Sequence, residues 1–163
     1  FFIHKRIGLR GKNFSLYKFR TMKHNRKEIL EKYFEVNKNA EVEWNQNQKL
    51  KNDHRITRVG YFLREFSLDE IPQIVNILKG EMSFVGPRPI VQKEIDKYGK
   101  VFNDYIRHKP GLTGLWQVSG RNNTTYKERV DMDLYYMNNK SLWLDLKILV
   151  KTIPVVLLRK GAY

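Results

Sequence analysis

Residues 63–80, with the sequence LREFSLDEIPQIVNILKG, are the stretch that most constrains how the chain can fold. Its apolar residues recur at intervals of three and four, the spacing of one helix face, at Ile71, Ile74, Val75 and Leu78. Gly80 follows them and is placed to end the helix. The pattern therefore predicts a helix with one apolar side.

The start of this helix can be placed in two ways. If Ser67 is the N-cap, Glu70 completes a capping box, but Pro72 then disturbs the second turn. If Asp69 is the N-cap, Pro72 lies in the first turn, where its missing N–H has no partner to lose. Either placement leaves two adjacent carboxylates, Asp69 and Glu70, at the positive end of a helix, which favours their ionised forms.

These carboxylates have two interpretations. Capping residues of this kind are common and stabilise a helix by about 1 kcal/mol. The alternative is a reactive site, because helix N-termini favour phosphate and a carboxylate can attack phosphorus to give an acyl phosphate. This segment alone favours capping, so the choice depends on the rest of the chain.

Composition narrows the class of protein. A chain of 163 residues, 41% of them hydrophobic, is long enough for one globular domain covering residues 1–163. It has no cysteine, which excludes disulfides and thiolate sites, and its four histidines are scattered without the spacing of a zinc site. No apolar run approaches the roughly 20 residues that span a bilayer. Because the chain begins with Phe1, we expect it to be part of a longer protein, and a membrane anchor upstream stays open.

Positive charge is concentrated at the start of the chain. The net charge is +14, and residues 1–27 contain nine Lys or Arg, no acidic residue, and several interleaved aromatic residues. This mixture suits an anionic membrane surface, and it suits single-stranded nucleic acid equally well. Composition does not separate the two.

Local patterns predict the remaining elements. Residues 8–13 form a turn between two extended pieces, with a strand over 14–20, and residues 23–52 form a surface insertion. Residues 91–109 are predicted to be one amphipathic helix. A capping box at Thr125 opens a further helix, and Ser141 opens a last one, which is either buried and kinked at Pro154 or lies in a membrane interface.

Two loops carry candidate ligand-binding residues. Arg88 stands between Pro87 and Pro89, which makes it either a stiffened arm suited to phosphate or an exposed turn residue. Residues 110–122 contain three glycines, so their backbone could approach a ligand closely. In the same loop Trp116 could stack on a base or sugar, or be a buried anchor.

Taken together, these stretches resemble the bacterial sugar transferases, the polyprenyl-phosphate hexose-1-phosphate transferases that begin capsule, O-antigen and exopolysaccharide assembly. The resemblance covers nearly the whole chain in order, through residues 5–8 (KRIG), 17–22 (YKFRTM), 55–60 (RITRVG), 67–70 (SLDE), 76–83 (NILKGEMS), 85–89 (VGPRP), 110–114 (PGLTG), 119–122 (SGRN) and 144–147 (LDLK). The chain departs from the usual family pattern at His54, where the family has proline, and at Glu81, where it often has aspartate.

The resemblance implies a membrane-bound enzyme that moves a hexose-1-phosphate from a UDP-sugar to undecaprenyl phosphate and releases UMP. It assigns Asp69 as the nucleophile that forms a covalent phosphosugar and Glu70 as the Mg²⁺ ligand. It also implies that phosphate is bound by Lys18, Arg64 and Arg88. Trp116, Gln117 and Arg121 are candidates for a nucleotide or sugar loop.

Further expectations follow from the same resemblance. The insertion and the end of the chain favour UDP-galactose or UDP-glucose, and the enzyme would act at the cytoplasmic face of the bacterial plasma membrane. We expect no nucleic-acid partner, and a homo-oligomer stays open. The expected fold is mainly helical α+β, with a small short-stranded sheet and interfacial amphipathic helices. The alternative is a non-catalytic basic module that binds single-stranded nucleic acid or anionic membrane.

Overall fold

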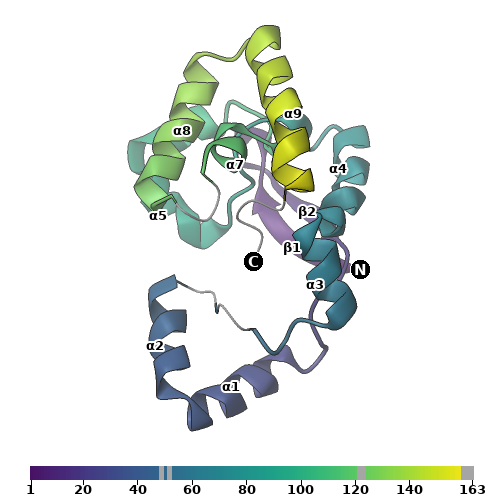
Figure 1. Cartoon of the computed structure of the whole chain (residues 1–163). Helices are drawn as coiled ribbons and strands as arrows, with labels where there is room; N and C mark the ends of the chain where they lie inside the picture. Colours follow the sequence, from purple (N-terminus) through teal and green to yellow (C-terminus); the bar gives the residue numbers. More distant parts are fainter. Residues whose placement is uncertain (48–49, 51–52, 121–123, 159–163) are drawn as a thin grey trace.

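The computed structural model describes residues 1–47, 50, 53–120 and 124–158 and shows the predicted mainly helical α+β fold (Figure 1). The strands are β1 (Phe2–Ile7), β2 (Asn13–Lys18), β3 (Ser83–Val85) and β4 (Gly111–Thr113). The longer helices are α1 (Arg26–Val36), α2 (Lys38–Asn47), α3 (Arg58–Glu65), α8 (Tyr126–Asn138) and α9 (Leu142–Leu157). Short helices are α4 (Ile74–Leu78), α5 (Ile95–Tyr98), α6 (Phe102–Tyr105) and α7 (Leu115–Ser119), with 3₁₀ turns η1 (Leu9–Gly11), η2 (Leu68–Gln73), η3 (Gln92–Glu94) and η4 (Gly99–Val101).

The N-terminal hairpin has the predicted form. β1 and β2 pair antiparallel in a register that runs from Phe2 opposite Lys18 to Ile7 opposite Asn13. The turn between them is closed by the Gly8 N–H, which donates to the Lys12 carbonyl at 2.8 Å. Lys18 therefore stands at the open end of the hairpin, where β2 contacts η2.

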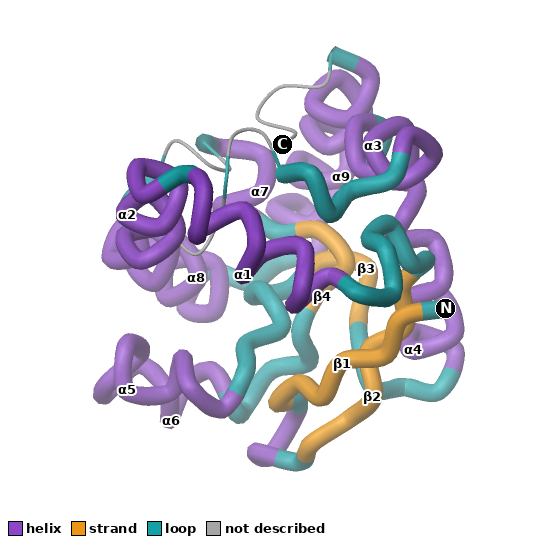
Figure 2. Tube along the Cα trace, turned by 90° about the horizontal axis from the view of Figure 1, so that it is seen from below, coloured by secondary structure: helices purple, strands orange, loops and turns teal. Residues whose placement is uncertain are grey.

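A second, parallel sheet of two short strands lies beside the hairpin (Figure 2). Ser83 is opposite Gly111 and Val85 is opposite Thr113. A Cβ on Gly111 would lie 2.1 Å from the backbone nitrogen of Gly86. This glycine of the 110–122 loop thus lets the loop pack against the backbone before Pro87, rather than against a ligand.

One core joins these sheets to the C-terminal helices. α8 and α9 run side by side in opposite directions above the sheets (Figure 1). Their inward residues pack with side chains of β1, β3 and α5–α6 in one buried cluster, which contains Ile7, Val85, Ile90, Tyr98, Tyr105, Val130, Tyr136, Met137 and Ile148. This packing fixes the strands and loops that carry the site.

The central stretch differs from its prediction. The chain forms the 3₁₀ turn η2 and then the short helix α4, because Pro72 lacks the N–H that a continuous α-helix would use at that position. Ser67 holds the N-cap position with φ at 55°, and its side chain makes no capping hydrogen bond; Asp69 lies inside η2. Gly80, with φ at 75°, follows α4 as predicted. Ser67 was therefore the right N-cap position, but its capping box with Glu70 does not form, and Asp69 as the N-cap was wrong.

The apolar stripe of this stretch forms, but it faces outward. Ile71, Ile74 and Val75 are 47%, 42% and 44% exposed, and Leu78 is 82% exposed. A stripe that is amphipathic in sequence thus adds little to the core. It leaves an apolar surface beside η2.

The prediction of one helix over residues 91–109 was wrong. The chain there makes η3, α5, η4 and α6, four short pieces. Gly99 has φ at 51° and interrupts the regular backbone after Tyr98. Because the pieces change direction, Tyr98 and Tyr105 both reach the core.

Residues 26–47 form two helices that pack against each other and lie apart from the other helices (Figure 1). α1 has no buried residue, as befits a surface segment. Its connection to the rest is a short antiparallel contact in which Met22 pairs with Ile56, flanked by hydrogen bonds from Lys23 N–H to the Arg55 carbonyl and from Thr57 N–H to the Thr21 carbonyl.

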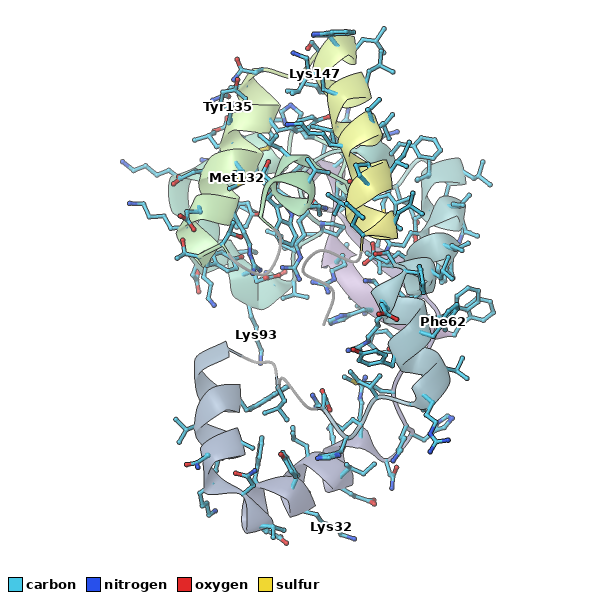
Figure 3. All side chains as sticks on the ribbon, in the orientation of Figure 1. Lys32, Phe62, Lys93, Met132, Tyr135 and Lys147 are labelled. Carbon is cyan, nitrogen blue, oxygen red and sulfur yellow. The ribbon has the colours of Figure 1, made fainter. Side chains whose placement is uncertain are left out.

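The last two helices begin where they were predicted. Thr125 accepts a hydrogen bond from Glu128 N–H in a capping box, and Ser141 accepts one from Leu144 N–H. α9 is buried at Ile148 but leaves most of its apolar side chains exposed, so it is not a fully buried core helix. That its exposed side lies in a membrane interface stays a prediction. Exposed aromatic side chains also project from α8 at Tyr135 and from α3 at Phe62 (Figure 3). Among the described helices, none combines the length and the apolar character needed to cross a bilayer.

Candidate active site

A cavity of about 1080 Å³ opens between the hairpin, η2, the Pro-Arg-Pro loop and the C-terminal helices. Its walls come from segments far apart in the sequence, including β2, α3, α7, α8 and α9. Almost all the site residues predicted from the sequence line it, namely Lys18, Arg64, Asp69, Glu70, Arg88, Trp116 and Gln117. Arg121 lies outside the described residues.

Asp69 is positioned by η2 and by its own backbone. Its carbonyl accepts a hydrogen bond from Phe19 N–H at 2.9 Å, which ties η2 to the end of the hairpin. Burial raises the pKa of Asp69 above its usual range, and the nearby charge of Lys18 opposes this shift. Burial thus acts against the ionised form, which the helix end was expected to favour.

Glu70 is held by an ion pair. Lys18 Nζ donates to Glu70 Oε1 at 2.5 Å, across the gap between the hairpin and η2. Both side chains keep partial access to solvent, at 27% for Lys18 and 35% for Glu70. The pair fixes one carboxylate oxygen of Glu70 and places a cation beside Asp69.

Arg64 reaches the cavity from the last turn of α3. Its Nε donates to Thr21 Oγ1 at 2.8 Å. Burial lowers the pKa of Arg64, and the charge of Asp69 opposes that shift. α3 can approach this closely because Gly60 has no side chain, since a Cβ there would lie 2.0 Å from the Thr21 carbonyl oxygen. The glycine of the RITRVG motif is therefore required sterically, because any side chain at this position would clash with the Thr21 backbone.

Arg88 is a held arm rather than an exposed turn residue. Pro87 and Pro89 are both buried, and Arg88 itself is half-buried. Its backbone N–H lies 3.4 Å from Asp133 Oδ2, and its guanidinium lies over the Trp116 ring at 5.5 Å from the centroid. The stiffened-arm interpretation therefore agrees with the packing on both sides.

Trp116 is a buried anchor, only 9% exposed. The ring lies under the guanidinium groups of Arg88 and Arg129, the latter 4.8 Å from the centroid. A base therefore cannot stack on the covered surface of the ring. The ring instead holds the guanidinium groups of Arg88 and Arg129 through cation–π contacts.

Sequence reasoning missed three residues of this wall. Arg6 and Arg129 line the cavity, and Asp133 is 1% exposed behind Arg88. Burial raises the pKa of Asp133 to about 7, and its hydrogen bond from Tyr98 opposes the shift. Arg6 belongs to the KRIG motif, so the sequence already marked its neighbourhood as part of the family pattern. Arg129 and Asp133 lie in an ordinary helix pattern, which did not indicate a role in the site.

The arrangement of the carboxylates indicates whether Mg²⁺ would fit in this cavity. Within the described ranges, no three His, Cys, Asp or Glu residues form a group that could hold a metal ion by themselves. Mg²⁺, however, is often bound by one or two carboxylates together with substrate phosphates. Glu70 beside Asp69 fits that second kind of site, with Lys18 occupying one Glu70 oxygen.

Comparison with known proteins decides the family. The family model described as bacterial sugar transferase matches residues 1–159. The chain belongs to the bacterial sugar transferase family. Its relatives in that family include an undecaprenyl-phosphate galactose phosphotransferase of Salmonella typhimurium, which is 52% identical over 160 residues, 98% of this chain and 34% of the relative.

Two further relatives of this sugar transferase differ in length. The exopolysaccharide production protein ExoY of Rhizobium meliloti is 51% identical, and the match covers all of this chain and 72% of the relative. A UDP-glucose:undecaprenyl-phosphate glucose-1-phosphate transferase of Xanthomonas campestris is 44% identical over all of this chain and 32% of the relative. The chain thus spans about a third of several relatives, including the Salmonella and Xanthomonas proteins.

Proposed function

We propose that this sugar transferase moves a hexose-1-phosphate from a UDP-sugar to undecaprenyl phosphate and releases UMP. The observation that carries the proposal is the cavity in which Asp69 and Glu70 stand beside cations from separate segments, Lys18, Arg64 and Arg88. A diphosphate needs such cations, because phosphoryl transfer depends chiefly on positioning and on stabilising charge.

In the first step, a carboxylate oxygen of Asp69 attacks the phosphorus next to the sugar. A P–O bond forms to Asp69, the P–O bond to the second phosphate breaks, and UMP leaves with that oxygen and its electron pair. Lys18 supports the step because its charge favours the ionised form of Asp69. The product is a covalent aspartyl phosphosugar.

In the second step, an oxygen of the lipid phosphate attacks the same phosphorus and releases Asp69. The lipid diphosphate sugar then leaves, and Asp69 is ready for another UDP-sugar. Two half-reactions at one carboxylate predict ping-pong kinetics.

Glu70 would hold Mg²⁺ together with the substrate phosphates. The ion would neutralise charge on the diphosphate as UMP leaves. Lys18, at 2.5 Å from Glu70, fixes the orientation of that carboxylate before substrate arrives. Activity should therefore disappear when the divalent ion is chelated.

The mouth of the cavity suits a lipid substrate. Apolar side chains from η2, α4 and α9 line it, and several are well exposed, namely Ile71, Ile74 and Leu149. Together with the basic N-terminal segment, these side chains would hold the site at the cytoplasmic face of the plasma membrane. The names of the relatives favour galactose or glucose as the sugar.

The test is UMP release with Mg²⁺, polyprenyl phosphate and a panel of UDP-sugars. We expect release with one sugar, and a loss of at least about 10³-fold in Asp69→Asn, since removal of a nucleophile has effects of that size or larger. Asp131→Asn, an isosteric change at an exposed position of α8, is the matched control and should keep wild-type turnover. Substantial turnover by folded Asp69→Asn would rule out this nucleophile.

A further inference from the structure

Two cations of the cavity wall share one aromatic ring. The guanidinium carbons of Arg88 and Arg129 lie 5.5 Å and 4.8 Å from the centroid of Trp116. Neither arginine has an ion pair with a carboxylate in the part of the chain that the structure describes. The wall therefore holds two guanidinium groups close together with no carboxylate paired to either side chain. The nearest acid behind them is the buried Asp133, whose pKa is raised by burial against the charges of both arginines.

This arrangement is electrostatically unfavourable without an anion. Burial lowers the pKa of Arg129, and the charge of Arg88 lowers it further. Tyr126 and Glu94 are the main groups that oppose this shift. Glu94 is already engaged, because it pairs with Arg6 at 3.6 Å and accepts a hydrogen bond from Val91 N–H at 2.9 Å. A bound phosphate would relieve the repulsion.

Unpaired polar atoms point to the same place. Five buried side-chain atoms have no hydrogen-bond partner among the described residues. Two of them are Arg6 Nε and Asp133 Oδ1, and the other three belong to cavity residues of α7 and α8, namely Arg129 Nε, Trp116 Nε1 and Gln117 Oε1. The Trp116 side chain belongs to a residue that is more than nine-tenths buried, and buried polar groups are normally hydrogen-bonded. Two of these three atoms are N–H donors, which suits a ligand rich in acceptor oxygens.

The part of the cavity around Asp69 is arranged differently. There Lys18 is paired with Glu70, and Arg64 donates to Thr21. A UDP-sugar carries two phosphates, of which one is attacked and one leaves. The paired cations stand beside the nucleophile, whereas the unpaired ones stand on the Trp116 wall.

We infer that Arg129, together with Arg88 and Trp116, binds the phosphate that leaves on the uridine nucleotide, while Lys18 and Arg64 face the sugar phosphate that Asp69 attacks. This inference rests on the proposed function. It assigns Arg129 a binding role in the first half-reaction alone, because the nucleotide has left before the lipid phosphate attacks.

The first experiment measures UMP binding directly by calorimetry. We expect Arg129→Gln to weaken UMP binding by roughly tenfold or more, the usual effect of removing a hydrogen bond to a charged group. Arg129→Lys should recover part of the affinity, because it keeps the charge but loses the planar fork. The matched control is Lys127→Gln, the same loss of charge at an exposed position of the same helix, which should bind UMP like wild type.

The second experiment separates the half-reactions. Arg129→Gln should raise the KM for UDP-sugar and slow the burst of UMP release. Transfer from the isolated phosphosugar enzyme to polyprenyl phosphate should keep its wild-type rate. An equal fall in both half-reactions, or UMP binding equal to that of Lys127→Gln, would overturn the inference.

The two proposals can fail separately. If wild type binds and releases UMP but Arg129→Gln behaves like Lys127→Gln, the role of Arg129 is wrong and the proposed function stands. If UMP binds through Arg129 but no sugar phosphate reaches the lipid, the proposed function is wrong and the binding role stands. Arg129→Lys, the milder change, provides the comparison if Arg129→Gln fails to fold.

Discussion

Two parts of the cavity wall both carry cations, but only one part provides them with hydrogen-bond or ion-pair partners. At η2, Lys18 pairs with Glu70 at 2.5 Å and Arg64 is bonded to Thr21, so the cations are already satisfied. At the α7–α8 wall, Arg88 and Arg129 lie over Trp116 with no carboxylate paired to either among the described residues. One end is organised before substrate arrives, and the other is completed by an anion.

This difference suggests a division of labour. A nucleophile benefits from fixed neighbours, because they need no rearrangement in the transition state. A site for a leaving group must bind its anion and then release it. Three variants, taken from the largest expected effect to the smallest, test whether the two ends act in this way.

Lys18→Gln should damage the η2 end most. It removes the cation beside Asp69, so we expect turnover to fall by roughly 10²–10³-fold, as when one charge-stabilising donor is removed from an active site. Lys18 normally lowers the pKa of Asp69 against the effect of burial. Without it that pKa rises further, and the acid limb of the kcat/KM profile should move to higher pH.

Lys12→Gln is the control for this variant. Lys12 is exposed at the opposite end of the same hairpin, so the charge change is equal and the site is untouched. UMP affinity should stay near the wild-type value in both variants, because the nucleotide phosphate lies at the other wall. A large loss of UMP binding in Lys18→Gln would contradict the division between the two ends.

The sequence predicted the η2 end better than the α7–α8 wall, for a physical reason. Asp69, Glu70 and Arg64 lie within one short stretch, so local spacing already brings them together. Arg129 reaches Trp116 only through the packing of α8 against α7, which no local pattern records. Arg88 was singled out by its two flanking prolines, and the resemblance supplied Lys18, which is distant in sequence.

Local patterns also failed where tertiary context changed their meaning. Thr125 and Ser141 were placed correctly, because a cap depends on its own first turn. The apolar stripe that contains Ile71 and Leu78 does form, but it faces outward. Periodicity predicts that one side of a helix is apolar and does not predict whether that side is buried. The prediction of one helix over residues 91–109 was wrong, because Gly99 adopts a positive φ that interrupts the helix despite the helical periodicity.

Asp133→Asn tests the support behind the α7–α8 wall. Burial raises the pKa of Asp133 to about 7, so between about pH 4 and pH 7 the folded chain keeps a proton that the unfolded chain has released. The free energy of unfolding therefore falls as pH rises through this range, by on the order of 3–4 kcal/mol, and this contribution levels off above pH 7. Asp133→Asn should lose that dependence.

Denaturant unfolding of wild type and Asp133→Asn at several pH values provides the measurement. The difference between the two proteins isolates Asp133, because carboxylates with a lowered pKa, such as Asp53, contribute equally to both. Asp131→Asn, on the exposed side of α8, is the control. A constant difference in unfolding free energy from pH 4 to pH 7 would mean that Asp133 does not titrate in the fold.

The smallest expected effect comes from the cap of α8. Thr125 accepts a hydrogen bond from Glu128 N–H at 3.2 Å, one residue before Arg129, and Thr125→Ala should lower the free energy of unfolding by about 1 kcal/mol. Ser141→Ala removes the cap of α9 and should have a similar effect on stability. If the first turn of α8 holds Arg129 in place, Thr125→Ala alone should also weaken UMP binding measurably. If both variants bind UMP like wild type, packing on Trp116 is sufficient to hold Arg129, and the wall is as firmly organised as the η2 end.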